Sequence, residues 1–112
     1  WEHDILKGVR VIKRRTLREF WERESGAEQT LRSWFDQARD ASWSDPAEVK
    51  AQFSTASILQ KGRVVFNIGG NKFRLVVEIN YKKHLVFVRF VGTHAEYDKI
   101  DAQTVKMKKV TP

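Results

Sequence analysis

The 112-residue sequence contains no cysteine, which excludes disulfide bonds and metal sites built from thiolates. It also lacks any apolar run near the roughly 18–20 residues that a membrane-spanning helix requires. No secretory signal pattern, with a basic start, an apolar stretch and a small-residue cleavage site, can be recognised. These absences are compatible with a cytoplasmic location, and they predict a protein that makes no contact with a membrane.

Several catalytic motifs are absent as well. There is no Gly-rich phosphate loop followed by Lys and Ser or Thr, no dinucleotide fingerprint and no H-E-x-x-H pair. The carboxylates show no pairing suited to glycoside hydrolysis. His3, His84 and His94 are too dispersed to predict a metal site. We therefore expect neither a metal nor an organic cofactor.

Length and composition predict one globular domain. A chain of this length can bury a sufficient core, and its hydrophobic content of 41% is typical of folded domains. Because the sequence begins with Trp1 rather than Met, residues 1–9 are interpreted as an N-terminal extension or as a segment foreign to the domain. Residues 10–112 are then expected to form the single domain.

The net charge of +7 comes entirely from the second half of the chain. Residues 1–50 carry ten Lys and Arg against ten Asp and Glu, whereas residues 51–112 carry eleven against four. So basic a half-chain indicates a polyanionic partner, either nucleic acid or an acidic protein. The alternative is a surface whose positive charge serves solubility alone.

The first half of the sequence predicts helices. Thr16–Glu19 and Ser25–Glu28 have the spacing of capping boxes, and Asp45–Pro46 is a third helix start with proline at the first helical position. After the second start, apolar residues recur at helical spacing, which indicates a core-facing stripe. The stripe consists of Ala27, Leu31, Trp34, Phe35 and Ala38.

The second half predicts strands, because residues 63–68, 72–81 and 84–91 are rich in β-branched and aromatic side chains. Gly69-Gly70 and Lys82-Lys83 fit tight two-residue turns between them, and residues 10–12 are a short strand candidate. Helices followed by strands predict an α+β fold, with N-terminal helices packed on one face of a small, mainly antiparallel β-sheet.

Strand alternation divides the side chains of this sheet between two faces. With two-residue turns, the apolar positions, Phe90 among them, share one face. The opposite face collects Arg63, Lys72, Arg74 and Arg89, with Arg74 and Arg89 as diagonal neighbours. A phosphate backbone would compensate the repulsion in such a cluster, because arginine pairs with phosphate bidentately. The alternative is a solvated outer face whose charges protect the sheet.

The segment after the third strand carries two proton-transfer candidates. Thr93 can cap a short helix with Glu96 at its third position. His94 and Tyr97 are then three residues apart and can lie on the same side of that helix. A lone histidine is more often structural, but a His–Tyr pair directly after a strand that presents Arg89 favours a catalytic site.

These strings resemble a known family. RVVFNIGGNKFRLVVEINY at 63–81 and VRFVGTHAEYDKID at 88–101 are similar to the signature of HigB-type toxins, members of the RelE-like superfamily, and residues 10–23 and 45–53 resemble the same family's N-terminal half. The resemblance implies a RelE-like fold and metal-independent cleavage of mRNA, generally on the ribosome, with the substrate 2′-OH as the nucleophile. It also implies a HigA-type antitoxin with a helix-turn-helix domain, bound in a hetero-oligomer.

The resemblance, taken with the chemistry of the side chains, gives the following site expectations. Arg74 and Arg89 would hold the scissile phosphate and stabilise its developing charge. His94 and Tyr97 would transfer protons, without an assignment of acid or base. Glu78 departs from the family picture, because it places an acid on the proposed basic face. The flanking RNA backbone would be held by Arg63, Lys72, Lys61 and Lys99.

Two other functions remain open at this point. The chain could be a non-catalytic module that binds nucleic acid, or a partner domain whose basic face docks an acidic protein. The His94–Tyr97 pair beside Arg89 distinguishes them, because only a nuclease requires it.

Overall fold

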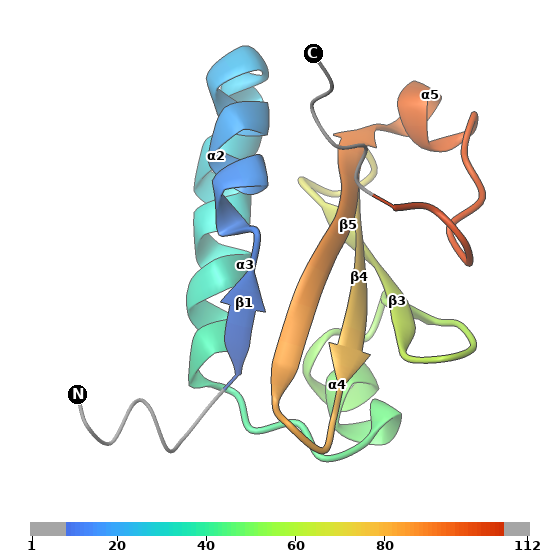
Figure 1. Cartoon of the computed structure of the whole chain (residues 1–112). Helices are drawn as coiled ribbons and strands as arrows, with labels where there is room; N and C mark the ends of the chain where they lie inside the picture. Colours follow the sequence, from blue (N-terminus) through green and yellow to red (C-terminus); the bar gives the residue numbers. More distant parts are fainter. Residues whose placement is uncertain (1–8, 107–112) are drawn as a thin grey trace, which may run out of the picture.

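The chain forms a five-stranded sheet with helices on one face and a short helix with the C-terminal segment on the other (Figure 1). The structure is a computed structural model, and it describes residues 9–106. The helices are α2 (Arg14–Arg23), the 3₁₀ turn η1 (Ser25–Ala27), α3 (Glu28–Asp40), α4 (Pro46–Gln52) and α5 (His94–Tyr97). The strands are β1 (Arg10–Ile12), β2 (Ser57–Ile58), β3 (Arg63–Ile68), β4 (Phe73–Asn80) and β5 (Leu85–Thr93).

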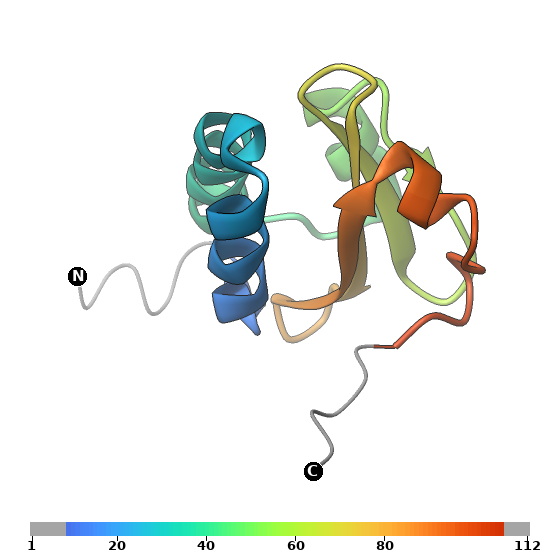
Figure 2. The same ribbon diagram turned by 90° about the horizontal axis from the view of Figure 1, so that it is seen from above.

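The α+β prediction is confirmed. The strand order is β1-β5-β4-β3-β2, and every neighbouring pair is antiparallel except β1 and β5, which run parallel. The two long helices α2 and α3 lie side by side on one face of the sheet, and α5 lies on the other side (Figure 2). Val9, which the sequence argument assigned to the extension, is buried in the core and donates its N–H to the carbonyl of Arg39.

Of the three helix starts predicted in the first half of the chain, only the one at Asp45 is correct. The Asp45 carboxylate accepts from the Glu48 N–H, and Pro46 is the first residue of α4. Helix α2 begins two residues before Thr16, because Lys13 adopts a left-handed conformation that turns the chain from β1 directly into the helix. Ser25 lies in the 3₁₀ turn, and neither Thr16 nor Ser25 forms the predicted cap.

The main core lies between the helices and one face of the sheet. The predicted stripe on α3 is confirmed, with four of its residues buried and Phe35 half-buried at the margin. Phe66 on β3 is at the centre, with its ring 5.0–6.3 Å from those of Trp34, Trp43 and Phe53. Aromatic side chains of this size contribute a large share of the buried apolar area. The sheet residues of this face are Val64, Phe66, Ile68, Phe73, Leu75, Val77, Ile79, Val86 and Val88.

The register of β3 on β4 differs from the prediction by two residues. Ile68 pairs with Phe73, so the connecting loop has four residues, and both of its glycines have positive φ. Arg74 therefore lies opposite Asn67 rather than Val65. Because side chains alternate with a period of two, this even shift leaves the side chains of β3 and β4 on their predicted faces. Lys72, predicted in the strand, lies in the loop instead.

The register of β4 on β5 is correct up to the pair Val77–Val88 and then changes at a β-bulge. Val76 pairs with Phe90 instead of Arg89, which makes Arg89 the extra residue of the bulge. The predicted place of Phe90 is consequently wrong. Its ring packs on the second face of the sheet, and Val91 takes its place against the main core.

Candidate functional site

The second face of the sheet, away from α2 and α3, is partly covered, so the expectation of an open basic surface is wrong. The segment that follows α5 crosses this face (Figure 1). A small apolar cluster forms beneath it around Val65, Val76 and Ala102. Partly buried side chains surround this cluster, namely Leu59, Phe90, Tyr97, Ile100 and Val105.

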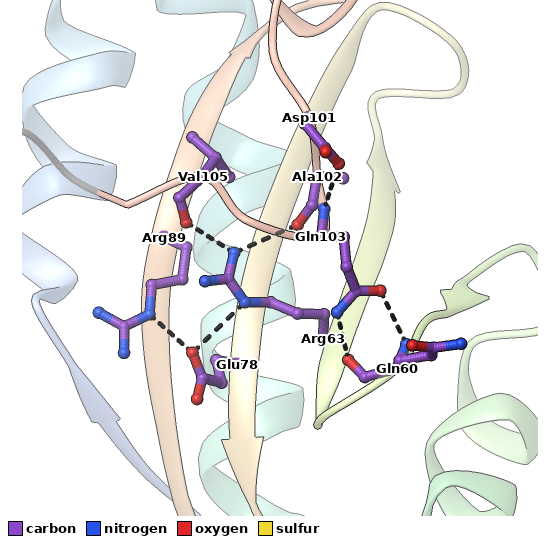
Figure 3. Close-up of polar contacts among 8 residues, drawn as sticks. All are labelled: Gln60, Arg63, Glu78, Arg89, Asp101, Ala102, Gln103 and Val105. Carbon is purple, nitrogen blue, oxygen red and sulfur yellow. Dashed lines mark hydrogen bonds and ion pairs between the residues drawn. The ribbon is translucent and has the colours of Figure 1, made fainter.

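Arg63 is buried by this covering segment, and its side chain is only 5% exposed. Its Nη1 atom donates to the carbonyl oxygens of Ala102 and Val105, at 3.2 and 2.6 Å. Its Nε lies 3.3 Å from Oε1 of Glu78 (Figure 3). A buried guanidinium needs partners for its charge and its donors, and these contacts supply an acidic neighbour for the charge and acceptors beside Nη1 and Nε. Arg63 thus fixes the C-terminal segment to the sheet, and it is not placed to meet an RNA backbone.

Glu78 connects Arg63 to Arg89. The same carboxylate oxygen that faces Arg63 accepts from Nε of Arg89 at 3.2 Å. The Arg89 guanidinium stands over the ring of Phe87, with Cζ 5.1 Å from the ring centroid. Its two Nη atoms point away from Glu78 (Figure 3). The acid that departs from the expected basic face is therefore the group that orients Arg89.

Arg74 lies nearer the β3–β4 loop on the same face. Its Nη2 donates to Oδ1 of Asn71 at 2.9 Å, and its Nη1 to the carbonyl of Phe73 at 3.2 Å. Its Cζ is 5.8 Å from the centre of the Tyr97 ring. Because of the bulge, Phe90 pairs with Val76. The centre of the Tyr97 ring lies 6.5 Å from that of the Phe90 ring. Arg74 and Arg89 thus have separate sets of partners on the two sides of this aromatic pair.

Helix α5 begins where the sequence predicts. Thr93 caps it, and the Thr93 hydroxyl and the Glu96 carboxylate form a complete capping box. The backbone hydrogen bond from Thr93 is the main cause of a lowered pKa of Glu96; burial opposes it, and the Arg23 side chain of α2 acts in the lowering direction. The cap and the ion pair hold α5 at the end of β5.

His94 is fixed from two sides. Its backbone N–H donates to the carbonyl of Lys72 at 3.0 Å, which ties the start of α5 to the β3–β4 loop. Its Nδ1 lies 3.2 Å from Oδ2 of Asp98, one helical turn further on. Both side chains are about half-exposed. The carboxylate beside Nδ1 sets the orientation of the ring and leaves Nε2 without a contact to Asp98.

The structure therefore brings together only part of the predicted set. Arg74 packs on Tyr97 of α5, and the backbone of His94, at the start of the same helix, is hydrogen-bonded to Lys72 in the β3–β4 loop. Lys99 follows this helix and is exposed. Arg89 lies further along the same face, and Lys61 is at the opposite end of β3.

Two contacts of the candidate residues were not predicted from the sequence. Asp98 stands four residues after His94, a spacing that predicts contact on any helix. Asn71 lies within the GNK string but reaches Arg74 through the geometry of a loop, and loop geometry is not readable from spacing.

Residues 9–106 contain no group of three or more His, Asp or Glu side chains arranged to hold a metal ion. No helix among them is both long and apolar enough to cross a membrane.

Residues 27–100 match the profile of a family described as HigB_toxin, the RelE-like toxic component of a toxin–antitoxin system. The chain belongs to the HigB toxin family. Over 72 residues it is 29% identical to the mRNA interferase HigB of Escherichia coli O6:H1 strain CFT073, covering 62% of this chain and 70% of that protein. Every candidate residue from Lys61 to Lys99 lies within the family match, and the resemblance found in the sequence is confirmed.

Proposed function

We propose that this HigB-family chain is an endoribonuclease that cleaves mRNA on the ribosome, in the cytoplasm and without a metal or cofactor. Membership of a family of toxic components and a relative named mRNA interferase support the activity. The observation that carries the assignment of the site is the packing of Arg74 on Tyr97, with His94 at the start of the same short helix and hydrogen-bonded through its backbone to Lys72.

The two arginines are assigned to the scissile phosphate. Glu78 holds Nε of Arg89 and leaves both Nη atoms directed outward, which is the geometry for a bidentate contact with two phosphate oxygens. Arg74 is held by Asn71 and packs on Tyr97, so its charge is also pre-oriented. Fixed cations stabilise the negative charge that develops on the phosphorus oxygens as the substrate 2′-OH attacks.

Proton transfer is assigned to His94 and Tyr97 as a pair. Attack by the 2′-oxygen forms a cyclic phosphate and breaks the bond to the 5′-oxygen, so one proton leaves the nucleophile and one reaches the leaving group. The Asp98 contact leaves Nε2 of His94 available, and the Tyr97 hydroxyl belongs to the same helix. Lys72 and Lys99, exposed beside them, are assigned to the flanking backbone of the RNA.

The proposed partners are the ribosome-bound mRNA and a HigA-type antitoxin with a helix-turn-helix domain. Family membership implies an antitoxin. Co-expression with the neighbouring reading frame, followed by pull-down, tests this partner. A toxin that arrests translation when expressed alone and co-purifies with the neighbouring product would support it.

The activity is tested by mapping mRNA 5′ ends by primer extension after brief induction in cells. Wild type should produce new ends within translated regions, and Arg89→Ala should produce few or none. Ribosomes are then removed from a purified cleavage assay, with and without EDTA, to separate the ribosome requirement from a metal requirement. Binding of mRNA without new ends would instead indicate a non-catalytic module.

A further inference from the structure

The molecule has a second concentration of arginine, away from the candidate site. A groove of about 630 Å³ lies on the helical layer, and its lining comes entirely from α2 and α3. The candidate site lies on the opposite face of the sheet, beside α5 (Figure 2). The groove is lined by Arg14, Arg15, Leu17, Arg18, Trp21, Arg32, Phe35 and Asp36.

The charge of this groove is only partly neutralised. Arg15 pairs with Glu19 at 3.4 Å and Arg32 with Glu28 at 2.8 Å, so two of its four arginines have acidic neighbours on their own helices. Asp36, its one carboxylate, is directed to Arg39 at 3.6 Å. Within residues 9–106, Arg14 and Arg18 form no ion pair.

The floor of the groove is apolar and its rim is cationic. Leu17 is buried, and Trp21 and Phe35 are half-buried. The guanidinium groups lie over the aromatic rings, with Arg32 4.9 Å from the Trp21 ring centroid and Arg14 5.7 Å from that of Phe35. Stacking of this kind holds an arginine in place while its Nη atoms remain available to an anion.

We propose that this groove binds an acidic, partly apolar segment of the antitoxin. Carboxylates would pair with Arg14 and Arg18 at the rim, and an apolar side chain would pack on Trp21 and Phe35. RNA is the alternative occupant of a cationic groove, and the oligouridylate titration below distinguishes it from the antitoxin. The inference rests on the antitoxin proposed above and is independent of the assignment of catalytic residues.

The test is the charge-reversed double variant Arg14→Glu/Arg18→Glu. Both side chains are exposed, and glutamate is compatible with the first turns of a helix, so α2 should form normally. The matched control is Lys82→Glu/Lys83→Glu, which changes the net charge equally in the exposed β4–β5 loop. The probes are the purified product of the neighbouring reading frame and a single-stranded oligouridylate, each titrated by calorimetry. Thermal unfolding checks that both variants are folded.

We expect the affinity for the neighbouring product to fall by about 100-fold in the groove variant and by less than about threefold in the control. Affinity for oligouridylate should be the same in both variants. Equal loss of antitoxin affinity in the two variants would overturn the proposal, and so would a selective loss of RNA affinity in the groove variant. If wild type itself does not bind the neighbouring product, the proposed partner fails together with this docking site.

Discussion

The two faces of the sheet are built by different rules, although the same three long strands supply both. The face under α2 and α3 is continuous and apolar, with side chains from Val64 to Val88 packed around Phe66. The second face mixes a small apolar cluster with an arginine–glutamate–arginine network, and a bulge in β5 interrupts its ladder.

The difference shows where stability and function are separated in this fold. On a face covered by helices, the side chains of sheet and helices must fill the space between them closely. Any ionisable group there would lose its hydration. The second face tolerates charge because Glu78 lies between Arg63 and Arg89, and because the side chains of Arg89 and Glu78 remain partly exposed. The candidate site therefore lies on the face where the packing is less continuous.

Truncating the centre of the first face should have the largest effect on stability. Phe66→Ala removes a ring that contacts three other aromatic side chains, and the expected loss in the free energy of unfolding is about 3–5 kcal/mol. Phe87→Ala, a half-buried ring on the second face, is the matched control, and it should cost less than about 2 kcal/mol. Urea denaturation measures both, and equal losses would remove the distinction between the faces.

Removing Arg74 or Arg89 from the second face should lower the rate of mRNA cleavage more than the free energy of unfolding. Arg74→Ala and Arg89→Ala should each lower single-turnover cleavage of bound mRNA by about 10²–10³-fold. His94→Ala and Tyr97→Phe should lower it by roughly 10²–10⁴-fold, with little change in RNA affinity. Lys82→Ala, in the exposed β4–β5 loop, is the matched control and should cleave at nearly the wild-type rate. Wild-type rates in all four site variants would refute the residue assignment.

Substitution of Glu78, which lies between Arg63 and Arg89, should affect both stability and cleavage rate. Glu78→Ala leaves the buried Arg63 without its acidic neighbour and releases Nε of Arg89, so both stability and cleavage rate should fall. The stability cost of such an unpaired buried donor is roughly 1–3 kcal/mol. Glu78→Gln keeps an acceptor oxygen and should recover most of the loss in rate. If glutamine were as slow as alanine, hydrogen bonding by Glu78 would not be what orients Arg89.

The smallest expected effect is a pH dependence of the free energy of unfolding. It arises at Glu96 of α5, which pairs with Arg23 of α2. The folded pKa of Glu96 is lowered, so its contribution to stability is present above the unfolded pKa and is lost as the pH falls through the folded pKa. The stability advantage of wild type over Glu96→Gln, which keeps the cap without the charge, should narrow as the pH is lowered from about 7 to about 3. Denaturation curves of the two proteins at several pH values measure this, and a constant difference would contradict it.

The sequence predicts the first face better than the second, and the reasons are physical. Alternation along β3, β4 and β5 and the helical stripe from Ala27 to Ala38 identify most of the main core, since both patterns reflect burial on one side. The helix start at Thr16 was mispredicted because the left-handed turn at Lys13 starts α2 two residues earlier. Ser25 does not cap α3, because it lies in the 3₁₀ turn that precedes this helix.

The candidate site depends on a β-bulge and on contacts between distant parts of the sequence, and neither can be read from the spacing of apolar residues. The bulge at Arg89 breaks the alternation on which the predicted basic face relied, so the predicted neighbours Arg74 and Arg89 have separate partners. Covering of Arg63 by residues near Ala102 is a contact between distant parts of the sequence. In contrast, the Thr93 cap that positions His94 and Tyr97 is local in sequence, and it was predicted correctly.

The bulge has a consequence for insertions and deletions. Val88 already pairs with Val77 and Phe90 with Val76, so deleting Arg89 would join these pairs into an unbroken ladder. Every other side chain of β5 would keep the face that it has now. The sheet can therefore be built one residue shorter, and Arg89 is a single-residue insertion that interrupts regular pairing to present one cation. A deletion variant should fold with the wild-type core and lose the guanidinium alone.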